Sequence, residues 1–144
     1  MTDRKTTIFE RWKAGSVTGV AKLLGFELTV FEPEYAVICF EAKADHHNPL
    51  GTLHGGVLCD LADAAMGTAW ASGVKVDESF TTVELKINYF RPVYSGKLTA
   101  EARVLRRGKT VGYIECDVFD ADRKLVCRAA STCMTLRGEQ AAGR

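Results

Sequence analysis

Apolar and polar residues alternate with two different periods along the chain. Between positions 57 and 70, apolar side chains recur every three or four residues, which is the spacing of a helix with a wide apolar face. From position 82 the period becomes two, which is typical of a strand with one buried and one exposed face. This alternation predicts that four side chains of the segment 82–89 share a face: Val83, Leu85, Ile87 and Tyr89.

Turn residues and apolar runs predict the other elements. Short helices are expected over residues 4–14 and 18–24, each followed by a glycine. Further strands are expected over residues 26–32, 35–42, 96–106, 110–120 and 124–136. Gly108 is expected to supply the positive φ of a tight hairpin, and the residues from Gly138 onward are expected to form a frayed tail.

These elements predict an α+β fold. Strands joined by short turns run antiparallel, and a single antiparallel sheet leaves one face to be covered by another element. The segment 54–72 is long and apolar enough to cover it, so we expect a curved antiparallel sheet wrapped around one central helix. The 144 residues fit a single domain, with N-terminal helices over about 4–24 and a core over about 25–136.

Composition excludes several classes of protein. The net charge of +1 gives no basic surface for nucleic acid. Five cysteines, an odd number without a Cys-x-x-Cys pair, favour reduced thiols over a zinc site or a disulfide framework. No signal peptide and no apolar run long enough to cross a bilayer is present, so we expect a cytoplasmic protein that binds no membrane, metal or separate cofactor.

Two carboxylates lie inside the predicted apolar helix. Asp60 is expected in the first turn, where a negative charge interacts favourably with the helix dipole. Asp63 lies beyond that turn, and burying an unpaired carboxylate is costly, so its presence indicates either a functional role or a hydrogen-bonded structural one. An ionised carboxylate can act as a nucleophile or as a general base.

The residues around this helix resemble the hotdog-fold acyl-CoA thioesterases, specifically the phenylacetate-degradation (PaaI-like) subgroup. The resemblance rests on Asn48, on the string Leu50-Gly-Thr-Leu-His-Gly-Gly56 and on Asp63. Two later strings extend it: Thr82-Val-Glu-Leu-Lys-Ile-Asn-Tyr-Phe-Arg-Pro92 and Arg106-Arg-Gly-Lys-Thr-Val111. The similarity spans residues 18–136 approximately, and it implies the hotdog fold, hydrolysis of an acyl-CoA thioester and no cofactor beyond the coenzyme A of the substrate.

The resemblance also implies roles for five catalytic residues. The backbone N–H of Gly55 would bind the oxyanion, and the unpaired N–H groups at a helix start suit that task. Asp63 would act as nucleophile or general base. Asn48 and His54 would contact the thioester region or hold the loop. The structural alternative for Asn48 is a turn residue before a proline, and that for His54 is a helix-start residue bonded to backbone. Thr82 would orient the attacking water or the carboxylate, unless it reflects strand propensity alone.

Substrate-binding residues follow from the same resemblance. Gly56, like its neighbour, has no side chain to keep a substrate away from the helix start. Arg91, Arg107 and Lys109 are candidates to meet the phosphates of coenzyme A, because cations pair with phosphate. The structural alternative for each of these cations is a solvated surface position.

The spacing of Gly55 and Asp63 indicates a site shared by two chains. The two are eight residues apart, about 12 Å along a helix, and the Asp63 side chain cannot span that distance. Two antiparallel helices across a two-fold axis would bring Gly55 of one chain to Asp63 of the other. The resemblance implies the same homodimer, and often a dimer of dimers.

Other activities fit the sequence less well. It contains neither the Gly-x-Ser-x-Gly elbow of a serine hydrolase nor a phosphate loop ending in Gly-Lys. Two alternatives stay open: a non-catalytic acyl-CoA sensor, and a hotdog hydratase or dehydratase acting on enoyl thioesters. The acyl group, which could be aromatic, medium-chain or long-chain, is open as well.

Overall fold

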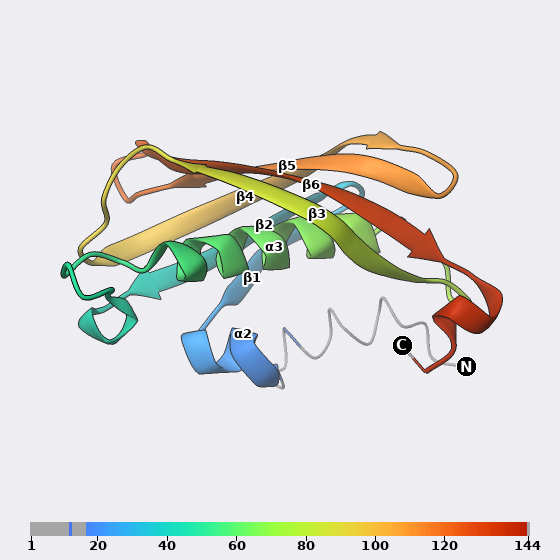
Figure 1. Cartoon of the computed structure of the whole chain (residues 1–144), viewed down its shortest axis with the longest axis horizontal. Coiled ribbons are helices and arrows are strands. Elements are labelled where there is room, and N and C mark those ends of the chain that lie inside the picture. Colours follow the sequence, from blue (N-terminus) through green and yellow to red (C-terminus); the bar gives the residue numbers. More distant parts are fainter. Residues whose placement is uncertain (1–11, 13–16, 144) are drawn as a thin grey trace.

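The computed structural model describes residue 12 and residues 17–143. The helix expected over 4–14 therefore lies outside the described residues, apart from Trp12. The elements in chain order are α2 (Gly19–Leu24), β1 (Glu27–Glu32), β2 (Tyr35–Ala42), η1 (Ala44–His46), α3 (Gly55–Ala71), β3 (Ser79–Tyr89), β4 (Gly96–Arg107), β5 (Val111–Phe119), β6 (Leu125–Leu136) and η2 (Gly138–Ala141) (Figure 1).

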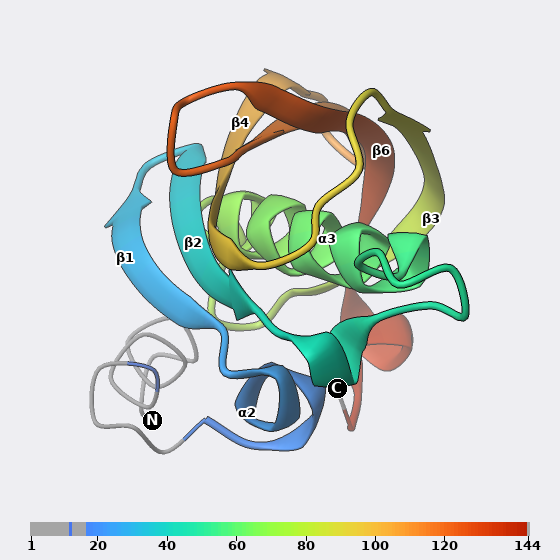
Figure 2. The ribbon, with the colours of Figure 1, turned by 90° about the vertical axis from the view of Figure 1, so that its left-hand side faces the viewer.

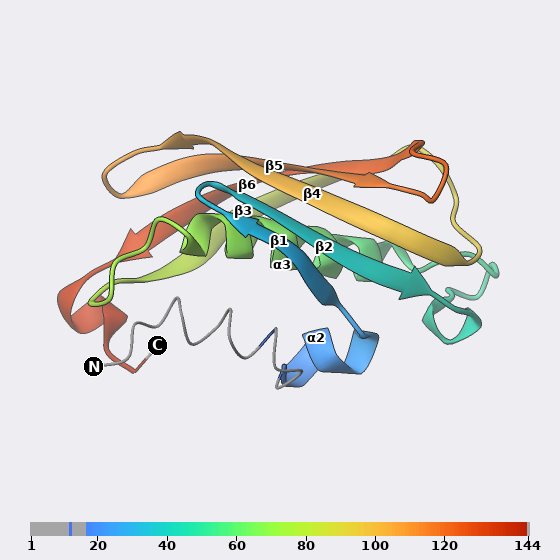
Figure 3. The same cartoon turned by 180° about the vertical axis from the view of Figure 1, so that it is seen from behind.

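The strands form one six-stranded antiparallel sheet in the order β1-β2-β4-β5-β6-β3. Figure 2 shows the sheet curving around α3, and Figures 1 and 3 show the helix running along its concave side. The α+β prediction, a curved sheet wrapped around one long helix, is confirmed. Residues 90–95 carry the chain away from β3, which pairs with β6 rather than with the next strand in sequence. As a result β3 lies at an edge of the sheet.

One face of α3 is buried against the inner face of the sheet. Its buried side chains are Leu58, Leu61, Ala62, Ala65, Met66, Ala69 and Trp70. The three alanines bring the helix backbone close to the strands, because a small side chain keeps little distance between packed elements. Gly112 in β5 lies directly under the Trp70 indole, so any side chain at that position would collide with the ring. The remaining faces of α3 stay partly exposed, so their side chains and the helix start are accessible to a ligand or to another chain.

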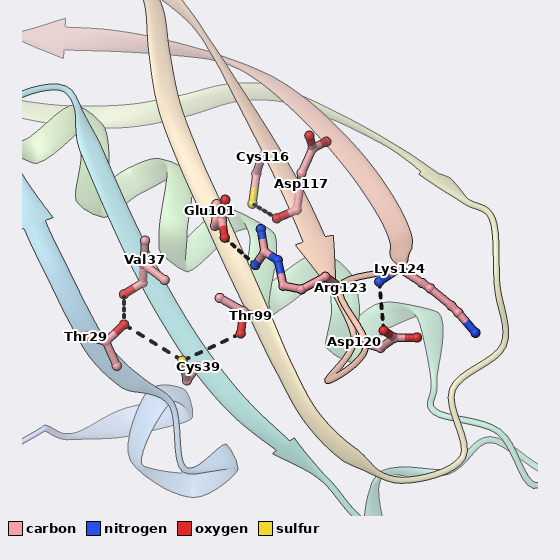
Figure 4. A network of polar contacts seen from close by, with 10 residues as sticks. All are labelled: Thr29, Val37, Cys39, Thr99, Glu101, Cys116, Asp117, Asp120, Arg123 and Lys124. Atoms are coloured by element: carbon pink, nitrogen blue, oxygen red, sulfur yellow. Dashed lines mark hydrogen bonds and ion pairs between the residues drawn. The ribbon is translucent and has the colours of Figure 1, made fainter.

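A group of polar contacts lies on the face of the sheet away from α3 (Figure 4). Thr29 and Thr99 each contact the Cys39 thiol at 3.9 Å. Arg123, from the turn between β5 and β6, donates to Glu101 at 2.6 Å. These contacts connect neighbouring strands, and none of them involves a residue of the helix.

The predictions for Gly108 and for the C-terminal residues are wrong. The φ of Gly108 is not positive; glycine is required there because a side chain would collide with the Val111 carbonyl, to which the Gly108 N–H donates at 2.9 Å. Residues 138–143 do not form a frayed tail, because they include η2 and bury Ala141. In both places a contact with a neighbouring strand or the core, invisible in the local sequence, determines the conformation.

Candidate active site

The start of α3 presents an unused backbone donor. His54 is the N-cap: its Nδ1 accepts from the Gly56 N–H at 3.0 Å, and its carbonyl accepts from the Val57 N–H at 2.9 Å. Within the described part of the chain, the Gly55 N–H makes no hydrogen bond. The helix dipole places partial positive charge at the same point. An anionic oxygen placed here would meet an available donor.

A pocket of about 360 Å³ opens beside this donor. One wall comes from the loop before α3 and from its first turn, including Asn48, Gly55 and Leu58. The other wall is the segment from Tyr89 to Val93, which contributes Phe90 and Arg91. Apolar and aromatic surface thus surrounds a small number of polar groups, which is the usual composition of a small-molecule site.

Asn48 shapes the loop that forms part of this pocket. Its Oδ1 accepts from the Leu50 N–H at 2.9 Å and from the Thr52 N–H at 3.3 Å. Its Nδ2 donates to the Thr52 hydroxyl at 3.1 Å. These hydrogen bonds are typical of a turn residue, which is the structural alternative given for Asn48 in the sequence analysis. Asn48 also lines the pocket.

Asp63 lies two turns along α3 and is bonded to the edge strand. The Thr82 hydroxyl donates to Asp63 Oδ1 at 3.3 Å. Thr82 faces the helix because β3 contains a bulge: Thr82 pairs with Cys133 and Glu84 with Thr132, so Val83 is an extra residue. The predicted alternation is therefore wrong at Val83, whose exposure is 58%. The bulge turns Thr82 toward Asp63 in place of Val83.

Asp60 does not lie in the first helical turn, contrary to the prediction. The helix begins at Gly55, and its first turn contains no acidic residue. Asp60 is instead a half-buried carboxylate of the second turn, where burial and the neighbouring Asp63 both raise its pKa. Burial, Asp63 and Asp60 likewise raise the pKa of the Cys59 thiol. This part of α3 therefore carries concentrated negative charge.

The candidate residues follow the seam between α3 and the edge strand β3. Gly55 contacts Tyr89 and Asp63 contacts Thr82, so helix and strand run in opposite directions along the seam. Gly55 and Asp63 are separated along α3 by the length of eight residues, about 12 Å. Asp63 does not line the pocket that contains Gly55. Within one chain the donor and the carboxylate therefore stay apart, as the sequence predicts.

The three candidate cations have different surroundings. Arg107 forms an ion pair with Glu34, donates to the Trp70 carbonyl at 2.7 Å and lies 3.7 Å over the Trp70 ring, at the far end of α3. The contacts of the Arg107 guanidinium are therefore structural ones within the chain. Lys109 has an exposed side chain on the turn that follows. Arg91 is exposed and lines the pocket, so it is the candidate cation nearest the Gly55 donor.

Two further observations concern metals and membranes. Among the residues that the structure describes, no group of three or more His, Cys, Asp or Glu side chains could hold a metal ion. In the same part of the chain, no helix combines the length and the apolar character that a membrane span requires.

Comparison with known proteins connects this geometry to an activity. The family model described as the thioesterase superfamily matches residues 50–127. A 1,4-dihydroxy-2-naphthoyl-CoA hydrolase from Listeria monocytogenes is 31% identical over 114 residues, which cover 79% of this chain and 93% of the hydrolase. The segment that the family model matches contains the candidate residues Gly55, Asp63 and Thr82.

Solved structures show the same fold. A thioesterase from Haemophilus influenzae superposes with a TM-score of 0.82 at 24% identity, covering 89% of this chain and 90% of the other. The PaaI protein of the Escherichia coli phenylacetic acid degradation operon superposes with a TM-score of 0.81 at 24% identity, covering 96% and 98%. The resemblance on which the sequence analysis relied is confirmed at the level of the fold.

Proposed function

The chain belongs to the thioesterase superfamily, and from that premise we propose that it hydrolyses an acyl-CoA thioester in an active site shared by two copies of the chain. It is a thioester hydrolase; the substrate class, the residues and the assembly are the proposal. The observation that carries it is the separation of two complementary groups, an open donor at Gly55 beside a pocket and a carboxylate at Asp63 outside that pocket.

The first step of the reaction needs a donor for the carbonyl oxygen. When a nucleophile adds to the thioester carbon, negative charge develops on this oxygen. The Gly55 N–H, at the positive end of the helix dipole, would stabilise that charge. The missing side chains of Gly55 and Gly56 leave room for the Tyr89 ring and the His54 imidazole beside the helix start. Arg91, exposed at the pocket, would meet an anionic part of the coenzyme A.

The second requirement is an attacking group, which Asp63 would supply. As a general base it takes a proton from water, the hydroxide adds to the carbonyl carbon, and the C–S bond breaks to release the acid and CoA thiol. As a nucleophile it forms an acyl anhydride, which water then hydrolyses to the same products. Thr82 donates to Oδ1, which leaves Oδ2 to face water or substrate in either route.

A second copy would complete the site through the edge strand. Gly55, Asp63 and the partners Tyr89 and Thr82 all lie on the seam at this edge of the sheet. Val83 and Tyr89 expose apolar surface there, at 58% and 50%. Two such edges related by a two-fold axis would run their helices antiparallel and create two equivalent sites.

Hybrid dimers test this proposal. Asp63→Ala should reduce release of free CoA from a panel of acyl-CoAs by at least about a hundredfold, since it removes the attacking group. A Gly55→Pro chain, which lacks the N–H, should be similarly defective. Unfolded and refolded together in equal amounts, the two variants should recover about one quarter of the wild-type activity, because half of the dimers then contain one intact site.

The two alternative activities, a hydratase and a non-catalytic sensor, would give different results when the wild-type protein is assayed with acyl-CoAs. A hydratase would change the absorbance of an enoyl-CoA without release of thiol, and a sensor would bind acyl-CoA without turnover. Absence of any recovery in the mixture, with both single variants folded and dimeric, would show that one chain alone supplies both groups.

A further inference from the structure

The peptide group between Gly55 and Gly56 is held at both ends by side chains. The Tyr89 hydroxyl donates to the Gly55 carbonyl oxygen at 2.7 Å. The N–H of the same peptide group, that of Gly56, donates to His54 Nδ1 at 3.0 Å. A peptide flanked by two glycines has more backbone freedom than any other pair of residues allows. Here that freedom is restrained from both sides.

Tyr89 also packs directly on Gly55. A Cβ at Gly55 would lie 3.0 Å from both Cζ and the hydroxyl oxygen of Tyr89, so the ring covers the Gly55 α-carbon. The backbone of Tyr89 is fixed by its pairing with Cys127 in β6. Burial raises the pKa of Tyr89 above its ordinary value, so the hydroxyl keeps its proton and remains a donor at neutral pH.

We propose that Tyr89 is a positioning residue, which together with His54 fixes the direction of the oxyanion-binding N–H of Gly55. That N–H belongs to the preceding peptide group, which is joined to the restrained one through the Gly55 α-carbon. With the restrained peptide fixed, the donor points into the pocket before substrate arrives. Preorganised donors stabilise a developing charge more than donors that must reorient. This inference rests on the proposed function, in which the Gly55 N–H binds the oxyanion.

Tyr89→Phe removes the hydroxyl and keeps the ring against Gly55. We expect kcat to fall by about three- to tenfold, the equivalent of one neutral hydrogen bond, while KM for the acyl-CoA stays within about twofold. Tyr94→Phe is the matched control: Tyr94 is 62% exposed, and its hydroxyl makes no hydrogen bond to any described residue. The control should keep the wild-type kcat.

Binding of two substrate analogues separates a positioning role from a structural one. A trifluoromethyl ketone analogue forms a tetrahedral, oxyanion-like adduct, whereas a thioether analogue has no carbonyl oxygen. Tyr89→Phe should weaken binding of the ketone by the same factor as kcat and leave binding of the thioether unchanged. Equal loss of affinity for both analogues, or a kcat equal to that of Tyr94→Phe, would overturn the inference while the hydrolase assignment stands. A wild-type protein that releases no thiol from any acyl-CoA would overturn both.

Discussion

Replacing Gly55 by proline removes the amide hydrogen on which the proposed reaction depends. Proline is well tolerated at the first position of a helix, since the N–H there has no helical partner. The residue before a proline must be extended, and His54 already has φ −61° and ψ 129°. The φ of Gly55 is not positive, so an L-residue fits the backbone. The variant should therefore fold.

Gly55→Ala is the control that isolates the lost hydrogen. Both variants add a Cβ 3.0 Å from the Tyr89 ring, so Tyr89 has to move by a few tenths of an ångström in each. Only the proline variant lacks the donor. Loss of one oxyanion donor typically costs about 10²–10³ in kcat, or about 2.7–4 kcal/mol of transition-state stabilisation. We expect that ratio between the alanine and proline variants.

The assay is the initial rate of thiol release from an acyl-CoA, with melting temperature and size-exclusion elution measured in parallel. The two variants should melt and elute alike while their kcat values differ by at least about a hundredfold. If Gly55→Pro keeps a kcat within about threefold of Gly55→Ala, the backbone N–H of Gly55 is not the oxyanion donor and the catalytic part of the proposal fails.

Two further predictions concern the assembly and the pH dependence of stability. Residue 59 is midway between Gly55 and Asp63, and Cys59 is the cysteine that is not buried. A short bismaleimide should therefore join two chains through Cys59, because packed helix axes lie about 8–10 Å apart. The control Cys59→Ser should not cross-link, and a wild-type dimer that does not cross-link would contradict the antiparallel arrangement. The Lys75 backbone N–H and Arg137 lower the pKa of Glu78. The ionised Glu78 carboxylate therefore stabilises the folded protein at any pH above the ordinary glutamate pKa, and this stabilisation is lost as pH falls through the lowered pKa. The difference in melting temperature between wild type and Glu78→Gln should therefore be constant near neutral pH and shrink below about pH 4.5; a difference that grows on acidification would refute this.

The helix and the placement of its donor and carboxylate could be predicted from the sequence because the relevant signals are local. A wide apolar stripe and a glycine-rich start define α3, which runs from Gly55 to Ala71 where 54–72 was expected. The open donor and the distance to Asp63 follow from helix geometry alone. The position of the carboxylate in an apolar helix needed no knowledge of the sheet.

The surroundings of these groups could not be predicted, since they depend on which strands pair. An extra residue in β3 leaves no trace in an alternating pattern, so Val83 was assigned to the wrong face. The partners of Arg107, which are Glu34 and the Trp70 carbonyl, come from segments distant in sequence. A cation that looks suited to phosphate was therefore indistinguishable from one that caps a helix end.

The position of β3 at the sheet edge connects the fold to the requirement for a second chain. In the interior of the sheet, a neighbouring strand would pair with β3, and another copy could not approach the seam. At the edge, the bulge turns Thr82 to Asp63, and the half-buried Asp63 carboxylate stays accessible to a second chain. A lone chain then has a donor without an attacking group at the same carbonyl. Hydrolysis should consequently decline on dilution in parallel with the fraction of dimer, and a specific activity that persists in a monomer would contradict the shared site.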